Sequence, residues 1–224
     1  MEIAPLKELK SRQHSVFLFL LLSWPFYLND FYLIPLQGSD LRLLWSLDII
    51  FFTLIPCTSL VWLYKKGHIT KSHLALHAPF KISHIFQGLF LCALSVILVH
   101  WLLMPKLASY LPGGFFYGYP FPMEEPYRTA TIMYASLSAA LMEEWIFTGV
   151  LITLLHKHIK STLALVIISS FIFSLIHWGQ GPTQLVNTFL LSVLPSYWFV
   201  RTRQLWGNMI YHFSYDYILF SGLV

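Results

Sequence analysis

The chain has 224 residues, of which 57% are hydrophobic and only 11% are charged, with a formal net charge of +4. A soluble domain carries roughly 25% charged residues and needs more polar surface than this composition supplies. The composition therefore excludes a soluble enzyme, a disordered tail and a disulfide scaffold, and it predicts an all-α protein embedded in a lipid bilayer.

Apolar stretches of membrane-spanning length follow one another along the chain. A bilayer core about 30 Å thick needs roughly 20 helical residues to cross it. Seven stretches approach this length, at about 15–36, 43–64, 84–104, 129–155, 161–178, 183–200 and 207–224. We therefore predict one membrane domain over residues 1–224, a polytopic bundle of about seven transmembrane helices with N-terminal helices at 15–104, an outer loop at 105–128 and a core at about 129–224.

The positive charges alternate between the two sides of this predicted bundle. Eleven of the 14 Lys and Arg residues fall in connections on the side of the N-terminus, and three, Arg42, Lys106 and Arg128, fall on the other side. Lys and Arg are retained on the cytoplasmic side of membrane proteins, which predicts a cytoplasmic N-terminus. The same rule accounts for the net positive charge without a nucleic-acid partner.

Adjacent carboxylates stand deep in the fourth predicted span, at Glu143 and Glu144. Ionisable groups are costly inside a bilayer and mark functional sites by default. No Lys or Arg occupies the middle of any predicted span, so a purely structural ion pair does not explain these acids. Other acids, including Asp30 and Asp48, fall in the tail, in loops or near span ends and carry no such implication.

Imidazole groups supply the complement to these acids. His177 ends the apolar run of the fifth span, and His212 lies in the last span between Asn208 and Asp216, four residues from each. Residues four apart share one face of a helix, so the last span carries a polar stripe.

The fourth and fifth predicted spans each carry a second residue one helical turn from a Glu or His candidate. Phe173 lies one helical turn from His177, and Thr148 lies one turn from Glu144. A carboxylate and an imidazole together can take a proton from water and later return it to a leaving group. Further donors can stabilise a developing oxyanion. This set of groups favours hydrolysis of an amide within or next to the membrane.

The order and spacing of these motifs resemble a known family. Glu143-Glu144 followed by Trp-Ile-Phe-Thr148-Gly149, then Phe173 and His177 four apart, then His212 and Asp216 four apart, resemble the CPBP family of intramembrane glutamic proteases. This family comprises the CAAX prenyl protease Rce1 and the bacteriocin-processing group, also called Abi. The resemblance covers about the last 100 residues, which would form the catalytic core.

The resemblance implies a role for each motif residue. Glu143 and His177 would activate the hydrolytic water, and His212 with the residue four later would form the oxyanion hole. Two positions depart from the family pattern, because Thr148 stands where the family has Arg and Asp216 stands where it often has Asn. An ionised Asp216 cannot donate to an oxyanion, so it would orient His212 or be itself protonated.

The resemblance also implies the surroundings of the reaction. The substrate would be a membrane-anchored protein or peptide: a prenylated CAAX protein, a bacteriocin leader or a C-terminal sorting signal. Neither a cofactor nor a metal is expected, and the membrane would be a prokaryotic plasma membrane. The oligomeric state is left open.

Three other functions use the same residues. A metal-dependent hydrolase would use Glu143, His177, His212 and Asp216 as zinc ligands, although the chain has no HExxH motif. A proton-coupled transporter would use buried Glu and His as a relay, although no internal repeat is present. A non-catalytic immunity or binding protein would grip a peptide in the same pocket.

Overall fold

A computed structural model describes residues 4–36, 41–74, 79–111 and 120–223, and for residues 4–12 the backbone alone. Every regular element in these ranges is a helix, which confirms the predicted all-α fold. The α-helices are α1 (Ala4–Leu36), α2 (Leu41–Asp48), α3 (Ile55–Lys65), α4 (Ile82–Ser95), α5 (Met104–Leu107), α6 (Tyr127–Glu143), α7 (Leu151–His156), α8 (Thr162–Ser174), α9 (Pro182–Thr202) and α10 (Trp206–Phe220).

Segments of π-helix and 3₁₀-helix join several of these α-helices into longer rods. Three π-helical segments, η1 (Ile49–Leu54), η2 (Val96–Leu103) and η4 (Glu144–Val150), continue α2 into α3, α4 into α5 and α6 into α7. Two 3₁₀ turns, η3 (Ala108–Tyr110) and η5 (Leu175–Gln180), follow α5 and α8. π-helical turns are rare and occur often at functional sites, which directs attention to η4.

Five rods within the described residues are long and apolar enough to cross a membrane: Gln13–Leu36, Leu41–Lys65, Ile82–Tyr110, Tyr127–His156 and Thr162–Gln180. They correspond to the first five predicted spans. The sixth and seventh predicted spans correspond to the helices α9 and α10, which are not among these five. The α10 helix has 15 residues, and at 1.5 Å per residue it is about 22 Å long, which is short of a bilayer core.

The outer loop predicted at 105–128 is partly helical. The third rod continues to Tyr110 instead of ending near residue 104, because α5 and η3 extend it. Residues 112–119 of this predicted loop, and 75–78 of the predicted cytoplasmic linker, lie outside the described residues.

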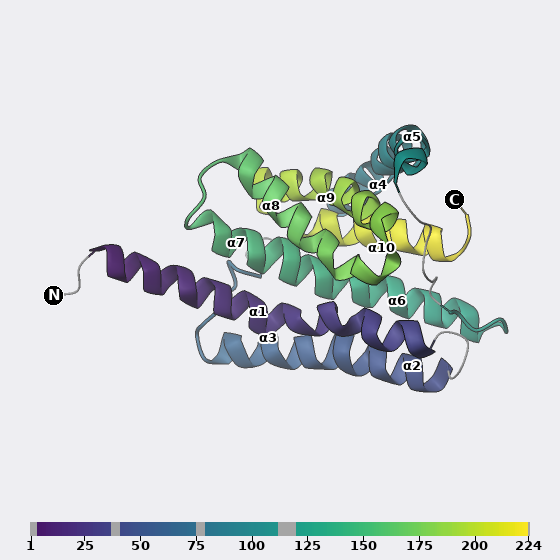
Figure 1. Cartoon of the computed structure of the whole chain (residues 1–224), viewed down its shortest axis with the longest axis horizontal. Helices are drawn as coiled ribbons and strands as arrows, with labels where there is room; N and C mark the ends of the chain where they lie inside the picture. Colours follow the sequence, from purple (N-terminus) through teal and green to yellow (C-terminus); the bar gives the residue numbers. More distant parts are fainter. Residues whose placement is uncertain (1–3, 37–40, 75–78, 112–119, 224) are drawn as a thin grey trace.

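The rods pack with the fourth one at the centre (Figure 1). The α1 helix lies between the α2–α3 rod and the α6–α7 rod, and α10 packs on the opposite side of α6 and against α4. The α8 and α9 helices pack against each other and complete the upper layer of the view. The fourth rod is 78% buried, against 28–50% for the other four candidate spans, so its polar groups face protein and not lipid.

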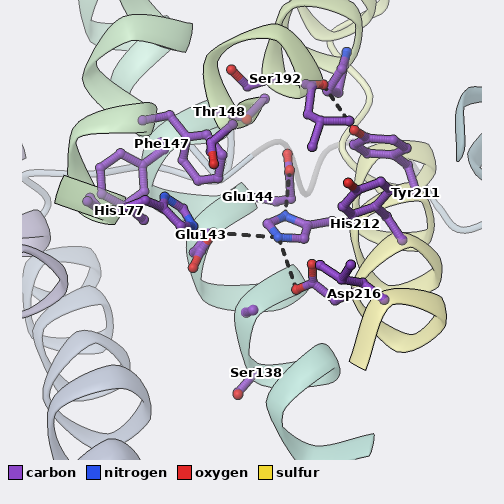
Figure 2. Close-up of a pocket in the computed structure, with 18 of the residues that line it drawn as sticks. Ser138, Glu143, Glu144, Phe147, Thr148, His177, Ser192, Tyr211, His212 and Asp216 are labelled. Atoms are coloured by element: carbon purple, nitrogen blue, oxygen red, sulfur yellow. Dashed lines mark hydrogen bonds and ion pairs between the residues drawn. The ribbon is translucent and has the colours of Figure 1, made fainter. Parts of the chain in front are cut away.

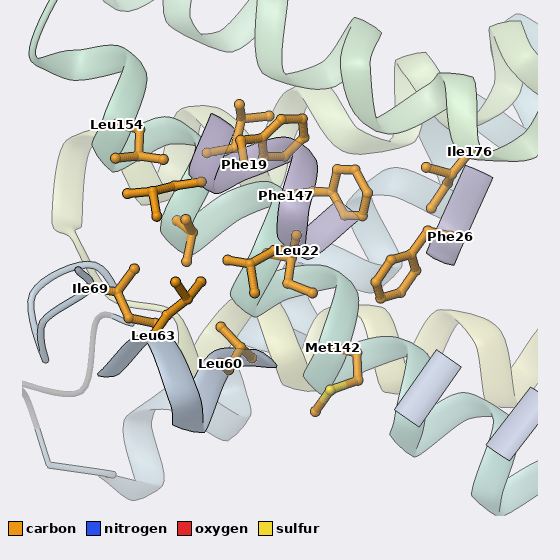
Figure 3. Packing of buried hydrophobic residues seen from close by; sticks show 14 of the residues in the cluster. Phe19, Leu22, Phe26, Leu60, Leu63, Ile69, Met142, Phe147, Leu154 and Ile176 are labelled. Atoms are coloured by element: carbon orange, nitrogen blue, oxygen red, sulfur yellow. The ribbon is translucent and has the colours of Figure 1, made fainter. Parts of the chain in front are cut away.

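The largest cluster of buried apolar side chains joins the N-terminal rods to the fourth one (Figure 3). Phe147 lies at its centre and makes edge-on ring contacts with Phe19 and Phe26 of α1, at centroid distances of 5.7 and 5.4 Å. Leu60 and Leu63 of α3 complete the opposite wall. Aromatic pairs of this kind contribute beyond their buried area, so α1 is firmly packed against η4.

A close helix–helix approach positions α10. Gly88 of α4 faces Ile210 and Gly207 of α10, and a Cβ atom built on Gly88 would lie 2.6 Å from the Ile210 Cβ and 2.7 Å from the Gly207 carbonyl oxygen. Small residues allow such backbone contact between membrane helices. The absence of a side chain at Gly88 therefore sets the distance between α4 and the helix that carries His212.

We predict that Gly88→Ala destabilises the protein in detergent by about 1–3 kcal/mol, because the added methyl group overpacks this contact. Thermal unfolding of the purified protein measures the change. Gly207→Ala is the matched control, since its Cβ would meet Gln87 at an ordinary 3.5 Å. Equal stability of the two variants would contradict the close approach.

Candidate active site

The adjacent acids lie where the fourth rod changes its helical turn. The α6 helix ends at Glu143 and the π-helical segment η4 begins at Glu144, and each residue is only 5% exposed. Consecutive helical residues point about 100° apart, so a helix packed on one side would expose one of the two. Both are buried here because this rod has protein on several sides.

His212 of α10 lies among three carboxyl groups (Figure 2). Its Nδ1 is 3.0 Å from Glu144 Oε1, and its Nε2 is 3.5 Å from Glu143 Oε2 and 3.4 Å from Asp216 Oδ2. A histidine donates from both ring nitrogens only in its doubly protonated form. In that form His212 offsets part of the negative charge of the three acids around it.

Hydrogen bonds to two α9 carbonyls, one of which a proline leaves free, join the α9 and α10 helices beside this cluster. Pro195 has no N–H, so the carbonyl of Leu191 lacks its usual partner within α9. The Tyr211 hydroxyl donates to that carbonyl at 3.0 Å. Asn208 Nδ2 donates to the Pro195 carbonyl at 2.9 Å and lies 3.5 Å from Glu144 Oε2. Asn208 is completely buried and supports Glu144 from behind the site.

His177 lies in the turn that follows α8, and not on a regular helix. Its φ of −101° and ψ of 23° interrupt the 3₁₀ segment η5. This bridge region of backbone conformation is sparsely populated and is found at many active-site residues. The Phe173 ring lies against both His177 and His212, at centroid distances of 5.6 and 6.0 Å.

The first helix holds the His177 turn in place. Asp30 Oδ2 accepts a hydrogen bond from the Gly179 backbone N–H at 2.5 Å. The Trp178 indole N–H donates to the Tyr27 carbonyl at 3.1 Å, and the Tyr27 hydroxyl donates to the Ile172 carbonyl at 3.2 Å. A Cβ atom on Gly179 would lie 2.6 Å from the Asp30 carboxyl carbon, so only glycine fits at this contact.

These groups surround a cavity of about 270 Å³. Among the residues expected from the sequence, those that line it are Glu143, Glu144, Thr148, Phe173, His177, His212 and Asp216. Asn208 does not line it. Figure 2 shows the His177 ring, from the turn after α8, close to the Glu143 carboxyl group at the end of α6, with His212 beside them.

Among the buried polar atoms of the cavity's lining residues, one on each of two catalytic candidates lacks a hydrogen bond. Neither Glu143 Oε2 nor His177 Nδ1 has a hydrogen-bond partner among the described residues, since the 3.5 Å between Glu143 and His212 exceeds an effective hydrogen bond. Buried polar groups are nearly always paired, and exceptions concentrate at functional sites. Two residues that line the same cavity, a carboxylate and an imidazole, therefore each keep one polar atom without a hydrogen bond.

Within the described ranges, no group of three or more His, Cys, Asp or Glu residues has an arrangement suited to a metal ion. The nearest set of side chains is the one around His212, in which each ring nitrogen already faces a carboxylate oxygen. The arrangement supplies acid–base groups.

Two further buried acids escaped the sequence reasoning. The sequence pattern places Asp30 and Asp48 near span ends with no special role, yet they are 0% and 3% exposed. Asp48 lines the cavity together with Asn29, whereas Asp30 holds the His177 turn. The sequence does contain a sign of this burial, because the polar pair Asn29-Asp30 lies inside an apolar run. Its closeness to the end of the span is not enough to dismiss it.

The comparison with protein families gives a match over residues 125–218. The matching family model is described as type II CAAX prenyl endopeptidase Rce1-like. The match includes all the motif residues named above and confirms the resemblance stated from the sequence. Neither the comparison with curated proteins nor the comparison with solved structures gave a match.

The helices and the family match together define the class. The chain is an integral membrane protein with several helices apolar enough to span a bilayer. Its segment 125–218 matches the Rce1-like endopeptidase model, which supports a protease.

We predict that Asp30→Ala loosens the His177 turn, because it removes the acceptor for the Gly179 N–H. Loss of one partner of a buried hydrogen bond costs about 1–3 kcal/mol. Hydrogen exchange measured by mass spectrometry is expected to rise in Leu175–Gln180. Glu125→Ala removes an exposed acid at the start of α6 and is the control. Unchanged exchange in the Asp30 variant would show that other contacts hold the turn.

Proposed function

We propose that the protein is a glutamic-type intramembrane endopeptidase that hydrolyses a peptide bond of a membrane-anchored protein or peptide. The observation that carries this proposal is the pair of unpartnered polar atoms, Glu143 Oε2 and His177 Nδ1, on two residues that line one cavity within the segment that matches the Rce1-like model. A water molecule between them would be both oriented and deprotonated.

The proposed reaction uses Glu143 as the general base. Glu143 takes a proton from the water that His177 orients, and the resulting hydroxide attacks the carbonyl carbon of the scissile amide. The tetrahedral intermediate then collapses, the C–N bond breaks, and Glu143 returns the proton to the leaving amine. Positioned groups of this kind accelerate proton transfer and also hold the reactants in line for attack.

His212 is the proposed donor to the oxyanion. Its Nε2 lies within 3.5 Å of Glu143 and of Asp216, next to where the carbonyl oxygen would develop charge. Glu144 holds the other ring nitrogen at 3.0 Å, and Asn208 steadies Glu144. In this proposal Asp216 orients His212 and is not itself an oxyanion donor, as an ionised carboxylate cannot donate.

The missing Arg of the first motif has a replacement in this arrangement. Thr148, which stands in its place, is buried and lines the cavity but offers no positive charge. His212 takes up the part of a charge partner for Glu144, since it forms the short contact with that carboxylate. Loss of the Arg is therefore compatible with catalysis.

We propose that the whole chain acts as one membrane domain in a prokaryotic plasma membrane, with its N-terminus in the cytoplasm. The packing of α1 against η4 and the hydrogen bonds of α1 to the His177 turn support the single domain. The excess of Lys and Arg on one side supports the orientation. A prenylated CAAX protein, a bacteriocin leader and a C-terminal sorting signal are the substrate classes to test.

We predict that Glu143→Gln abolishes hydrolysis while the protein still folds. Gln matches Glu in shape and removes a buried charge, so stability changes little, but it cannot accept the proton from water. Removal of a general base costs about 10²–10⁴ in rate. Cleavage of labelled candidate substrates by monodisperse protein in detergent measures the loss.

Two further variants serve as comparisons for Glu143→Gln. Glu144→Gln is expected to cost less, because Gln still accepts a hydrogen bond from His212. Glu124→Gln changes an exposed acid of a second Glu-Glu pair, Glu124-Glu125, which precedes α6. It is expected to leave the hydrolytic activity unchanged. Turnover by Glu143→Gln equal to that of the unsubstituted protein would refute the proposed base.

We predict that the activity survives metal chelators and inhibitors of serine and cysteine proteases. Each proposed step uses carboxylates, imidazoles and water, and no nucleophilic side chain forms a covalent intermediate. Activity after dialysis against EDTA, with and without added Zn²⁺, is the measurement. Loss on dialysis that Zn²⁺ restores would instead favour a metal-dependent hydrolase.

A further inference from the structure

The active-site cavity extends to a second group of buried polar side chains on helices before residue 125. Asn29 of α1 and Asp48 of α2 line the same cavity as Glu143 and His177. They are only 6% and 3% exposed. Neither has a part in the proposed hydrolysis, and both lie outside the segment that matches the Rce1-like family.

Asp48 is held by neutral donors and not by a cation. The Tyr134 hydroxyl donates to its Oδ2 at 3.3 Å, and the Tyr32 hydroxyl lies 3.5 Å from its Oδ1. A carboxylate has about four acceptor positions, so two phenols leave it capacity for a further donor. Thr53 extends this hydrogen-bond network, because its hydroxyl lies 3.0 Å from the Tyr134 hydroxyl.

The neighbouring amide also has an acceptor to offer. Asn29 Oδ1 is buried and has no hydrogen-bond partner among the described residues. Leaving such an acceptor unpaired is costly, and native proteins rarely do so without a reason. Asp48 and Asn29 thus contribute acceptor oxygens and a negative charge to the lining of the cavity.

The remainder of the cavity adds negative charge and little positive charge. Its acidic residues are Asp48, Glu143, Glu144 and Asp216, and none of its described lining residues is Lys or Arg. Histidines are its basic groups, and they belong to the catalytic cluster. A ligand that reaches Asp48 therefore meets acceptors and a field that attracts cations.

We propose that Asp48 and Asn29 form a subsite for a Lys or Arg side chain of the substrate. The inference rests on the proposed protease function and names the kind of sequence that is cleaved. An ammonium or guanidinium group would supply the donors and the positive charge that these side chains lack. The apolar stem of such a side chain suits the surrounding apolar walls.

The position of this subsite fixes the position of the cation in the substrate. Tyr134, which bonds Asp48, precedes Glu143 by nine residues in the same rod, a rise of about 14 Å. An extended peptide rises about 3.3 Å per residue, so this distance corresponds to about four residues. The substrate is thus expected to carry its Lys or Arg about four residues from the bond that is cleaved.

Depth in the membrane is compatible with a charged side chain at this place. Asp48 is the eighth residue of the Leu41–Lys65 rod, which puts it about 10 Å from the end of that rod. Long cationic side chains reach between the interface and such depths by extending their stems. A basic residue next to the anchor of a membrane-bound substrate can therefore reach the subsite.

The test uses three membrane-anchored peptides that are identical except for Lys, norleucine or Glu at this position. Cleavage by the unsubstituted protein in liposomes is expected to favour Lys over norleucine by about 30-fold in kcat/KM, the usual scale for a buried charge pair, and to reject Glu. In Asp48→Asn the preference for Lys is expected to vanish, while cleavage of the norleucine peptide persists. Cleavage of the three peptides by the unsubstituted protein is enough to establish the preference for Lys.

A matched control and a binding measurement make the outcome specific. Thr53→Val disturbs the same hydrogen-bond network but keeps both acceptor groups, so it is expected to retain the preference for Lys. Binding of the fluorescently labelled peptides to Glu143→Gln, which does not hydrolyse them, is expected to show the same order of affinity. Monodispersity and unfolding temperature establish that each variant is folded.

The results separate the two proposals. Cleavage of Lys and norleucine peptides at equal rates, or a preference that Asp48→Asn retains, would overturn the subsite and leave the protease intact. Stronger binding of the Lys peptide without cleavage would support the subsite and refute the protease. Equal binding of the two peptides by Glu143→Gln would also overturn the subsite.

Discussion

The burial of Glu143 and Glu144 side by side in an apolar bundle is the constraint on which the site depends. Removal of two carboxylates from water costs several kcal/mol per ion even after relaxation, and an unpaired buried charge is strongly destabilising. Among the described residues that line the cavity no Lys or Arg offsets them, and the imidazole of His212 contacts both. The distance between α10 and the fourth rod is therefore set by electrostatics as well as by packing.

Other features of the bundle serve the same contact. Gly88 lets α4 approach α10 closely, so that α10 is held against the fourth rod from its far side. Pro195 frees a carbonyl of α9 that Tyr211 of α10 then uses, and Asn208 links α9 to Glu144. Each feature is a local departure from regular helix packing, and together they fix the orientation of His212.

Helices outside the family match contribute to the cavity of the candidate site. Asp30 and Tyr27 of α1 hold the turn that carries His177, and Asn29 and Asp48 extend the cavity away from the catalytic groups. The residues that perform the proposed chemistry lie within 125–218. The residues proposed to select the substrate lie before it, which allows selectivity to vary while the chemistry is kept.

The sequence by itself determined the membrane class, the five long apolar spans and the identity of the catalytic candidates, because these follow from local composition and from helical spacing. Its count of seven spans is not confirmed, since five helices of the described residues are long and apolar enough to cross a membrane, and an apolar run does not reveal where a helix ends. Only the tertiary structure decided that Asp30 and Asp48 are buried, that Asn208 lies behind the cavity and that His177 leaves the helix to face Glu143. These outcomes depend on contacts between residues more than 60 positions apart, such as Asp30 with Gly179 and Asn208 with Glu144, which no local pattern encodes.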